Sequence, residues 1–363
     1  MLIREIELSN LLSFGPRTGA LELRNLNVFI GPNGAGKSNL VEALTLLHSA
    51  PNELAVPVRK VGGVREWLWK HGKGTPVATI RAEIDFPGGT MPLRHSLSFT
   101  EVGQRFEITD ERIENARPFQ GHEKPYFFFG CDNGRYMLNV AATGPRFLRQ
   151  EEVDPQKSII AQRRDPSQYP EITYLADVYD RIQVFREWSF GRNTPPRVPQ
   201  STDLKNDFLE EDASNLALVV NRLRQVGDVK ERILEELHQL YDGIRDFDVK
   251  IDGGTVQLFL QEGSHPIPAT RLSDGTLRFL GLLCILCHPS LPPLVCIEEP
   301  ELGLHPDVIP TLARLLQEAS QRTQLIVTTH SDTLVDALTD DPEAVVVTEK
   351  QDGATTFRRL EKE

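Results

Sequence analysis

The stretch Gly31-Pro32-Asn33-Gly34-Ala35-Gly36-Lys37-Ser38 fits the pattern Gly-x-x-x-x-Gly-Lys-Ser of the phosphate-binding P-loop. The apolar residues 26–30 before it are typical of a buried strand. Residues 39–48 after it predict a helix, because apolar residues recur there at three- and four-residue spacing. Strand, loop and helix are the context that the motif requires. The sequence therefore predicts a nucleotide site here, in place of a glycine-rich turn that binds nothing.

The residue types of this loop suit a bound phosphate chain. Glycine lets the backbone approach an anion closely, and the following helix start adds a partial positive charge. Lys37 would contact the β- and γ-phosphates, and the Ser38 hydroxyl would ligate Mg²⁺. The expected cofactors are therefore ATP and Mg²⁺. The residues expected to hold the nucleotide are Asn33, Gly34, Ala35, Gly36, Lys37, Ser38 and Asn39.

The composition is that of an ordinary soluble globular protein. The 363 residues are 39% hydrophobic and 25% charged, enough for two average domains or one large α/β domain. The net charge of −12 argues against nucleic-acid binding through the overall charge and leaves a local basic groove open. The N-terminus lacks the apolar core of a secretion signal, and the longest apolar run, 279–287, is about half a membrane span. We expect a cytoplasmic protein.

Two of the four cysteines have the C-x-x-C spacing of zinc and redox sites. Cys284 and Cys287 lie inside the apolar segment 280–287, and neither a second pair nor a nearby set of histidines completes a site. We interpret them as buried core thiols.

The patterns divide the chain into three segments. Residues 1–115 predict strands on both sides of the P-loop, including an antiparallel sheet over 77–113. Residues 116–244 predict a helical and irregular lobe with a buried aromatic strand at 126–129. Residues 245–363 begin with a hairpin that turns at Gly253-Gly254. The lobe is expected to hold helices with apolar faces over 172–185, 216–223 and 228–241. No heptad pattern is sustained, so no coiled coil is expected.

Charged side chains follow two apolar strands in the last third of the chain. Glu298-Glu299-Pro300-Glu301 comes directly after the strand 294–297, and His330 comes after the strand 324–329. Carboxylates at the carboxyl end of a core strand are where P-loop enzymes hold Mg²⁺ and orient water. Upstream, Ser273 is expected to cap an apolar helix whose start forms a second anion site.

Together these motifs resemble the ABC-type ATPase head of the SMC/RecF/OLD class. The motifs are the P-loop, Leu272-Ser273-Asp274-Gly275, Glu298-Glu299-Pro300-Glu301, Gly303-Leu304-His305-Pro306 and Thr329-His330-Ser331, in that order. The likeness is greatest to compact stand-alone bacterial AAA-type ATPases without coiled coils. It implies an α/β P-loop NTPase fold with a mixed core sheet, an antiparallel β subdomain and a helical lobe.

The resemblance also implies residue roles. Lys37, Glu299 and His330 would be catalytic, with Glu299 as the base that polarises water and His330 as the switch histidine. Glu298 takes the Walker B position and would bind the metal, although aspartate is commoner there. The family's Q-loop glutamine, a further metal contact, is assigned to Gln162, with Gln156 and Gln150 as alternatives.

The same resemblance implies that two chains share each ATP. Ser273 and Gly275 would contact the γ-phosphate bound to the opposite subunit, while Asp274 stands where many members have glycine. The implied function is a homodimeric, ATP-gated switch in DNA repair or maintenance or in anti-phage defence, acting directly or through a separate effector such as a nuclease. Direct DNA binding stays open, and no membrane partner is expected.

Two other functions use the same P-loop. A transporter nucleotide-binding subunit is disfavoured by the long interval between Lys37 and Ser273, which exceeds that of this compact class. A small-molecule kinase would need neither Ser273 nor a dimer.

Overall fold

The computed structural model describes residues 1–72, 74–132, 135–140, 143–186 and 188–362. The chain folds into two compact units, each assembled from distant parts of the sequence. Unit 1 comprises Met1–Asn27, Gly31–Ile182 and Val346–Arg359, and unit 2 comprises Val28–Ile30, Gln183–Val345 and Leu360–Glu363. Whereas the three predicted segments follow the order of the chain, these units do not, and the three-part division stays a prediction.

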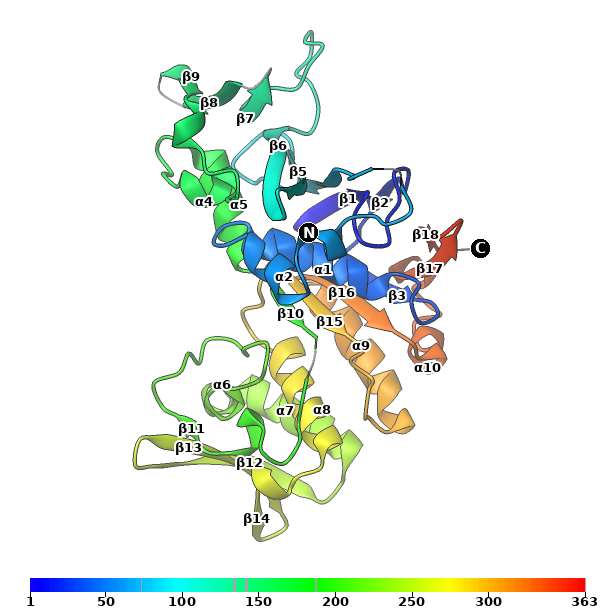
Figure 1. Ribbon diagram of the computed structural model, residues 1–363. Coiled ribbons are helices and arrows are strands. Elements are labelled where there is room, and N and C mark those ends of the chain that lie inside the picture. Colours follow the sequence, from blue (N-terminus) through cyan, green and yellow to red (C-terminus); the bar gives the residue numbers. More distant parts are fainter. Residues whose placement is uncertain (73, 133–134, 141–142, 187, 363) are drawn as a thin grey trace. The chain divides into compact units, whose positions relative to one another are not determined.

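Unit 1 contains an eight-stranded antiparallel sheet in the order β2-β1-β4-β5-β6-β7-β8-β9 (Figure 1). Alternate residues of β4 and β5 are buried, as expected for a sheet with one face on the core. The antiparallel sheet predicted over 77–113 is confirmed. The strands are β1 Ile3–Ser9, β2 Ala20–Glu22, β4 Ala78–Ile84, β5 Leu93–Val102, β6 Arg105–Asn115, β7 Phe127–Asp132, β8 Arg135–Val140 and β9 Gly144–Leu148.

The helices α2 and α5 of unit 1 pack on α1, the helix that follows the P-loop. Its apolar residues Leu40, Val41, Leu44 and Leu47 are fully buried, which confirms the predicted apolar face. The His48 imidazole nitrogen Nδ1 lies 2.9 Å from the Tyr179 carbonyl oxygen and joins α1 to α5. The remaining elements are α1 Lys37–Ser49, α2 Ala55–Lys60, α3 Val64–Trp67, α4 Ile159–Gln162, α5 Pro170–Asp180, and the antiparallel hairpin of β17 Val345–Gln351 and β18 Ala354–Arg359.

Unit 2 is organised by a sheet with the strand order β10-β15-β16-β3. The strands are β10 Gln183–Phe185, β15 Leu294–Glu298, β16 Gln324–Thr329 and β3 Leu26–Ile30. β15 is parallel to both β10 and β16. All of β16 and all but the last residue of β15 are buried, as in a sheet covered on both faces. The helix α9, Ile309–Ser320, packs on β16 (Figure 1).

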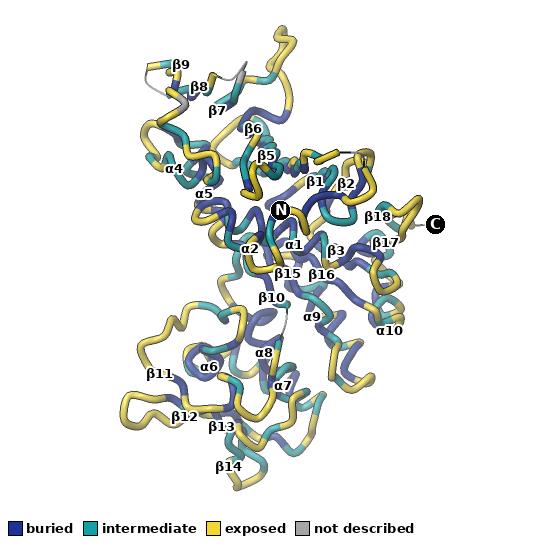
Figure 2. The backbone as a smooth tube through the Cα atoms, viewed as in Figure 1, coloured by how far each residue is buried: buried dark blue, intermediate teal, exposed yellow. Residues whose placement is uncertain are grey.

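The rest of unit 2 is a lobe of helices and a small sheet. Its helices are α6 Leu216–Leu223, α7 Gly227–Leu240 and α8 Asp274–Leu286, and its strands are β11 Gln200–Ser201, β12 Ile244–Asp252, β13 Thr255–Glu262 and β14 His265–Pro268. α8 is almost entirely buried beyond its first turn (Figure 2). Gly253 and Gly254 have φ values of 54° and 79°, so the predicted hairpin is confirmed. α10 spans Asp332–Asp336, and short 3₁₀ segments span Gln150–Glu152, Pro195–Arg197, Ala269–Arg271, Pro306–Val308 and Pro342–Ala344.

Two predictions in the middle of the chain were only partly right. The helix expected over 172–185 ends at Asp180, and Gln183–Phe185 forms β10. Apolar residues continue at helical spacing past the end of α5, but pairing with β15 makes this short segment a strand. The aromatic strand expected at 126–129 begins at Phe127, and Tyr126 is 46% exposed while only Phe129 is buried.

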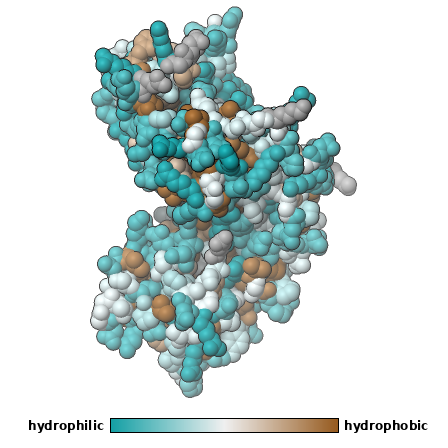
Figure 3. Space-filling model, in the orientation of Figure 1, coloured by the Kyte–Doolittle hydropathy of each residue, from teal (hydrophilic) through white to brown (hydrophobic). Residues whose placement is uncertain are grey.

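The surface offers no apolar belt in the view of Figure 3. Hydrophilic residues predominate on that face, and hydrophobic ones occur in small groups. Among the described residues, no helix is both long enough and apolar enough to cross a membrane. The longest helix described, α7, has 14 residues, which agrees with the expectation of no coiled coil.

Candidate ATP site

The P-loop joins β3 to α1 and depends on its glycines. Gly36 has a φ of 112°, a region that other residues rarely adopt. A Cβ atom on Gly31 would lie 2.1 Å from the Thr348 carbonyl oxygen, so the backbone there approaches too closely for a side chain. The loop conformation therefore requires the residues that define the motif.

Lys37 is held by the loop itself. Its side chain is only 5% exposed, and its ammonium group donates to the carbonyl oxygens of Gly31, at 2.7 Å, and Pro32, at 3.3 Å. Ser38 is exposed, and no side chain of the described residues caps the start of α1. Backbone N–H groups at an uncapped helix start can bind an anion.

The other predicted nucleotide contacts differ in exposure. Asn33 and Gly34 are exposed, whereas Ala35 is buried. The Asn39 amide nitrogen Nδ2 donates to the Ser13 hydroxyl at 2.7 Å, so this group serves the protein framework.

In unit 2, the parallel strands β15 and β16 end beside each other. Glu298 of β15 lies opposite Thr328 of β16, and the Glu299 N–H donates to the Thr328 carbonyl at 2.9 Å. Glu299 has a φ of 48°, a left-handed conformation that costs about 1 kcal/mol or more outside glycine and is common at functional sites. The chain thus turns sharply at the predicted catalytic base.

The two predicted catalytic side chains of unit 2 meet. His330 Nε2 lies 3.3 Å from Glu299 Oε1, and the two side chains are 37% and 38% exposed, so both can reach a ligand. Glu301 fixes this corner, because its Oε1 accepts from the Thr329 hydroxyl at 2.5 Å and from the His330 N–H at 3.0 Å. The sequence places Glu301 in a motif but predicts no role for it.

The Glu298 carboxylate forms an ion pair that the sequence did not predict. Arg186, directly after β10, donates from Nε to Glu298 Oε2 at 2.9 Å. β10 is the parallel neighbour of β15, so its carboxyl end lies at the same edge of the sheet. Because the sequence predicts a helix through residue 185, it gives no indication that Arg186 lies at this edge of the sheet.

The Ser273 turn has the predicted capping role. Its hydroxyl accepts from the Thr276 N–H at 3.0 Å at the start of α8. A Cβ atom on Gly275 would lie 2.7 Å from the Gly303 carbonyl oxygen, which explains glycine there. The unusual Asp274 is paired with Arg197, which is 5% exposed and also donates to the carbonyls of Leu272, at 2.6 Å, and Ala269, at 3.0 Å.

Arg278 connects α8 to the carboxylate corner. Its guanidinium donates to the carbonyl oxygens of Glu299, at 3.3 Å, and Trp188, at 3.2 Å. Burial lowers the pKa of Arg278, and the nearby carboxylates of Glu301, Glu299 and Asp274 act in the opposite direction. This contact gives a physical link between the Ser273 helix and the backbone at Glu299.

Gln162 lies in unit 1, in α4. Its amide donates to the Lys157 carbonyl at 2.7 Å, and its oxygen accepts from the Asp154 N–H at 2.9 Å. These bonds close a local loop, and the metal-binding role of Gln162 stays a prediction. Cys284 and Cys287 are free and buried, as expected.

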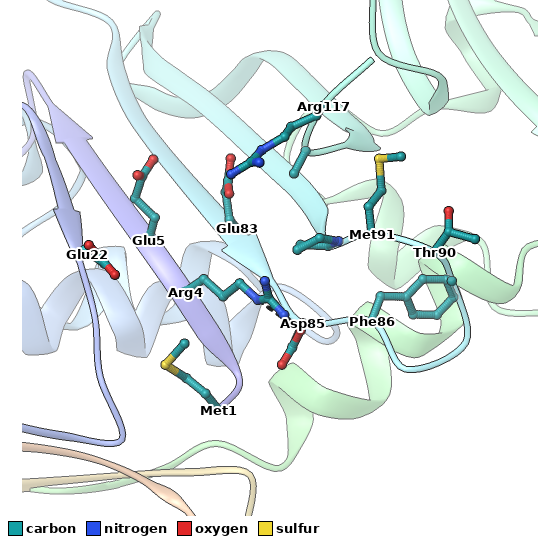
Figure 4. Close-up of a pocket in the computed structure, with 13 residues that line it drawn as sticks. Met1, Arg4, Glu5, Glu22, Glu83, Asp85, Phe86, Thr90, Met91 and Arg117 are labelled. Atoms are coloured by element: carbon teal, nitrogen blue, oxygen red, sulfur yellow. Dashed lines mark hydrogen bonds and ion pairs between the residues drawn. The ribbon is translucent and has the colours of Figure 1, made fainter. Parts of the chain in front are cut away.

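A cavity of about 600 Å³ in unit 1 has the wrong charge for a triphosphate (Figure 4). Four carboxylates line it, those of Glu5, Glu22, Glu83 and Asp85, against the two guanidinium groups of Arg4 and Arg117, and Arg4 is paired with Asp85 at 2.6 Å. Burial raises the pKa of Glu5, and the neighbouring carboxylate of Glu83 acts in the same direction. The excess of carboxylates disfavours a polyphosphate in this cavity.

ABC-type ATPases combine a P-loop with carboxylates at the end of a parallel strand and with a serine at the start of a core helix. This chain has each of these parts, with the local geometry described above. The fold and the motifs define an ABC-type ATPase of the SMC/RecF class. The chain belongs to the family described as "AAA domain, putative AbiEii toxin, Type IV TA system", whose model matches residues 26–336.

Individual relatives agree with this class. The DNA replication and repair protein RecF of Acidothermus cellulolyticus is 27% identical over 299 residues, which cover 79% of this chain and 68% of RecF. A structure of an Smc head bound to the C-terminal winged-helix domain of ScpA matches with a TM-score of 0.63, at 14% identity, over 99% of this chain and 98% of that one. The Smc head with an extended coiled coil from Pyrococcus furiosus, bound to the ScpA C-terminal domain, matches with a TM-score of 0.61, at 14% identity, over 99% and 96%. These structures support the fold.

Proposed function

We propose that this chain binds and hydrolyses ATP, and that two copies pair around the nucleotide to form a switch. The observation that carries the proposal is the contact between Glu299 and His330 at the ends of two parallel strands. Within unit 2 the strand order is β15-β16-β3, and the P-loop follows β3 directly in sequence. Hydrolysis needs positioning and charge neutralisation more than covalent chemistry.

Each side chain has a defined task in this proposal. Lys37 and the first N–H groups of α1 bind the phosphates and neutralise their charge. Glu299 orients the attacking water and accepts its proton, and His330 holds the Glu299 carboxylate and contacts the γ-phosphate. The 3.3 Å contact between the two side chains keeps the base in place before the nucleotide arrives.

The donor set suits Mg²⁺, a hard cation that prefers a few oxygen ligands and keeps several waters. The Ser38 hydroxyl and the Glu298 carboxylate would hold it. When bound, Mg²⁺ would supply positive charge that offsets the negative charge of the phosphates. Arg186 orients the Glu298 side chain, and its guanidinium group would compete with Mg²⁺ for the Glu298 carboxylate.

The Ser273 turn completes the site of a second copy. Ser273 is exposed at the start of α8, and Gly275 allows the close approach to Gly303. Arg197 holds this turn through Asp274 and the carbonyls of Leu272 and Ala269, and the exposed Ser273 hydroxyl would contact the phosphate. Each active site would then need two chains.

The name of RecF, a DNA replication and repair protein, supports a role in DNA repair or maintenance. The toxin named in the family description supports the alternative role in anti-phage defence. In both settings the ATP state would control a separate effector such as a nuclease, or DNA itself.

Mixing two inactive variants tests the shared site. Lys37→Met disables the P-loop, and Ser273→Asp keeps a good helix cap while placing a negative charge against the γ-phosphate. Each variant alone should be inactive, and an equal mixture should recover about a quarter of wild-type ATPase activity, since half of randomly formed dimers contain one intact site of two. If the mixture is as inactive as each variant alone, the two chains do not share an active site. If Ser273→Asp alone is fully active, the site resembles that of a small-molecule kinase, which does not need Ser273.

Replacing Arg186 by glutamine should lower the Mg²⁺ concentration that gives half-maximal ATPase activity. The variant removes a charge-assisted bond to Glu298 worth about 1.5 kcal/mol, so the shift should be about tenfold. Arg186→Lys keeps the positive charge, so its half-maximal Mg²⁺ concentration should lie between those of wild type and Arg186→Gln. If Mg²⁺ dependence is the same in all three proteins, Arg186 does not compete with the metal.

A further inference from the structure

Two hydroxyl groups from distant parts of the chain meet behind the P-loop. Ser13 lies between β1 and β2, and Thr355 is the second residue of β18, in the red hairpin of Figure 1. Their oxygens are 2.7 Å apart, and the Thr355 N–H donates to the Ser13 carbonyl at 2.8 Å. Thr355 is completely buried, at 0% exposure. We call Ser13 and Thr355 the hydroxyl pair.

The directions of the hydrogen bonds at this pair follow from the chemistry. Thr355 Oγ1 lies 2.7 Å from the Ala35 carbonyl oxygen, which can only accept, so Thr355 donates its single hydrogen there. Thr355 must then accept from the Ser13 hydroxyl. Ser13 in turn accepts from Asn39 Nδ2 at 2.7 Å. The relay runs from Asn39 through Ser13 and Thr355 to Ala35, so both of its ends lie in the nucleotide-binding segment.

The P-loop also packs directly on this pair. A Cβ atom on Gly36 would lie 2.1 Å from Thr355 Oγ1 and 2.7 Å from Ser13 Oγ. The loop has no room to shift toward the hairpin, and the hydrogen bond to Ala35 opposes a shift away from it.

The bond to Ala35 fixes the plane of one peptide group. The carbonyl of Ala35 and the N–H of Gly36 belong to the same peptide unit, and in a trans peptide they point in opposite directions. Because Thr355 holds the carbonyl toward the hairpin, the Gly36 N–H is aimed away from the hairpin. Backbone N–H groups of a P-loop are the groups that cradle phosphate.

We infer that the hydroxyl pair positions the P-loop for nucleotide binding, so that the C-terminal hairpin is a working part of the ATP site. The inference rests on the proposed function, because it concerns the affinity of the same site. Neither residue touches the nucleotide, and both act by orienting the peptide between Ala35 and Gly36.

Thr355→Val tests this positioning role, because valine has nearly the same shape and lacks the hydroxyl. In the full-length protein, the dissociation constant for ATP measured by calorimetry should rise about tenfold, since a buried carbonyl loses its donor. The KM for ATP should rise in parallel, with kcat at saturating ATP changed by less than about twofold. Thr355→Ser restores the donor and should return the affinity to within about twofold of wild type.

The hairpin offers a matched control. Thr348 in β17 is also 0% exposed, and its hydroxyl has no hydrogen-bond partner among the described residues. Thr348→Val should leave ATP affinity unchanged. Equal affinities of Thr355→Val and wild type, or equal losses in both valine variants, would overturn the inference.

If Thr355→Val fails to fold, a second variant still tests the inference. Ser13→Ala breaks the relay at a half-buried position and should weaken ATP binding about threefold, and unchanged affinity in this variant counts against the hydroxyl pair. Wild-type protein that binds no ATP refutes the proposed function itself, and the inference with it. Wild-type protein that binds ATP as tightly as Thr355→Val and Ser13→Ala refutes only the inference.

Discussion

Glu299→Gln is expected to bind ATP normally and to hydrolyse it about 100- to 10,000-fold more slowly than wild type, the range lost with a general base. Glutamine has the shape of glutamate, and its oxygen can still accept from His330, so the corner geometry is kept. Only the charge and basicity are removed. Single-turnover hydrolysis of labelled ATP measures the chemical step, and light scattering during gel filtration measures the oligomer.

Because Glu299→Gln binds ATP but hydrolyses it slowly, its oligomeric state should also change. If ATP closes the dimer and hydrolysis reopens it, Glu299→Gln should accumulate as a dimer with ATP and remain a monomer without it. Glu235→Gln, on an exposed position of α7, is the matched control and should match wild type in both assays. Wild-type turnover in the Glu299→Gln protein refutes the assignment of the base.

Lys37→Met is expected to weaken ATP binding by about 100-fold or more. The ammonium group would form charge-assisted bonds to phosphate oxygens, each worth roughly 1.5–3 kcal/mol. Methionine keeps an apolar stem of similar length in this buried position, so the fold should survive. Calorimetric titration with ATP measures the loss, and thermal unfolding without nucleotide checks the fold.

An exposed lysine in the same unit provides the comparison. Lys70→Ala removes a surface charge paired with Glu66 and should leave ATP affinity unchanged. If Lys37→Met binds ATP as tightly as Lys70→Ala, the nucleotide lies elsewhere and the P-loop assignment fails.

The sequence was most informative where function depends on local geometry. The P-loop was predictable because Gly31 and Gly36 meet backbone constraints that no other residue satisfies. Glu299 and His330 were predictable as strand-end residues because each follows a strand of buried apolar residues. The glycine loop and each of the two strand ends are patterns of a few consecutive residues.

Interactions between distant segments were not predictable in the same way. Arg186 was not predictable because Ile182 and Phe185 continue the helical spacing of α5, and only pairing with β15 shows residues 183–185 to be a strand. Thr355 follows an ordinary hairpin turn, and nothing in its neighbourhood indicates that it contacts residues 320 positions earlier. Such partners are set by tertiary packing, which a single sequence does not encode as a local pattern.

The contribution of β18 to unit 1 has a consequence for how the protein is made. Translation proceeds from the N-terminus, so the ribosome releases residues 31–38 long before it synthesises Thr355. A nascent chain therefore carries an unsupported P-loop until Thr355 has emerged. The proposed nucleotide-dependent pairing would require chains that extend past Thr355, and translation products truncated before that residue would be unable to enter it.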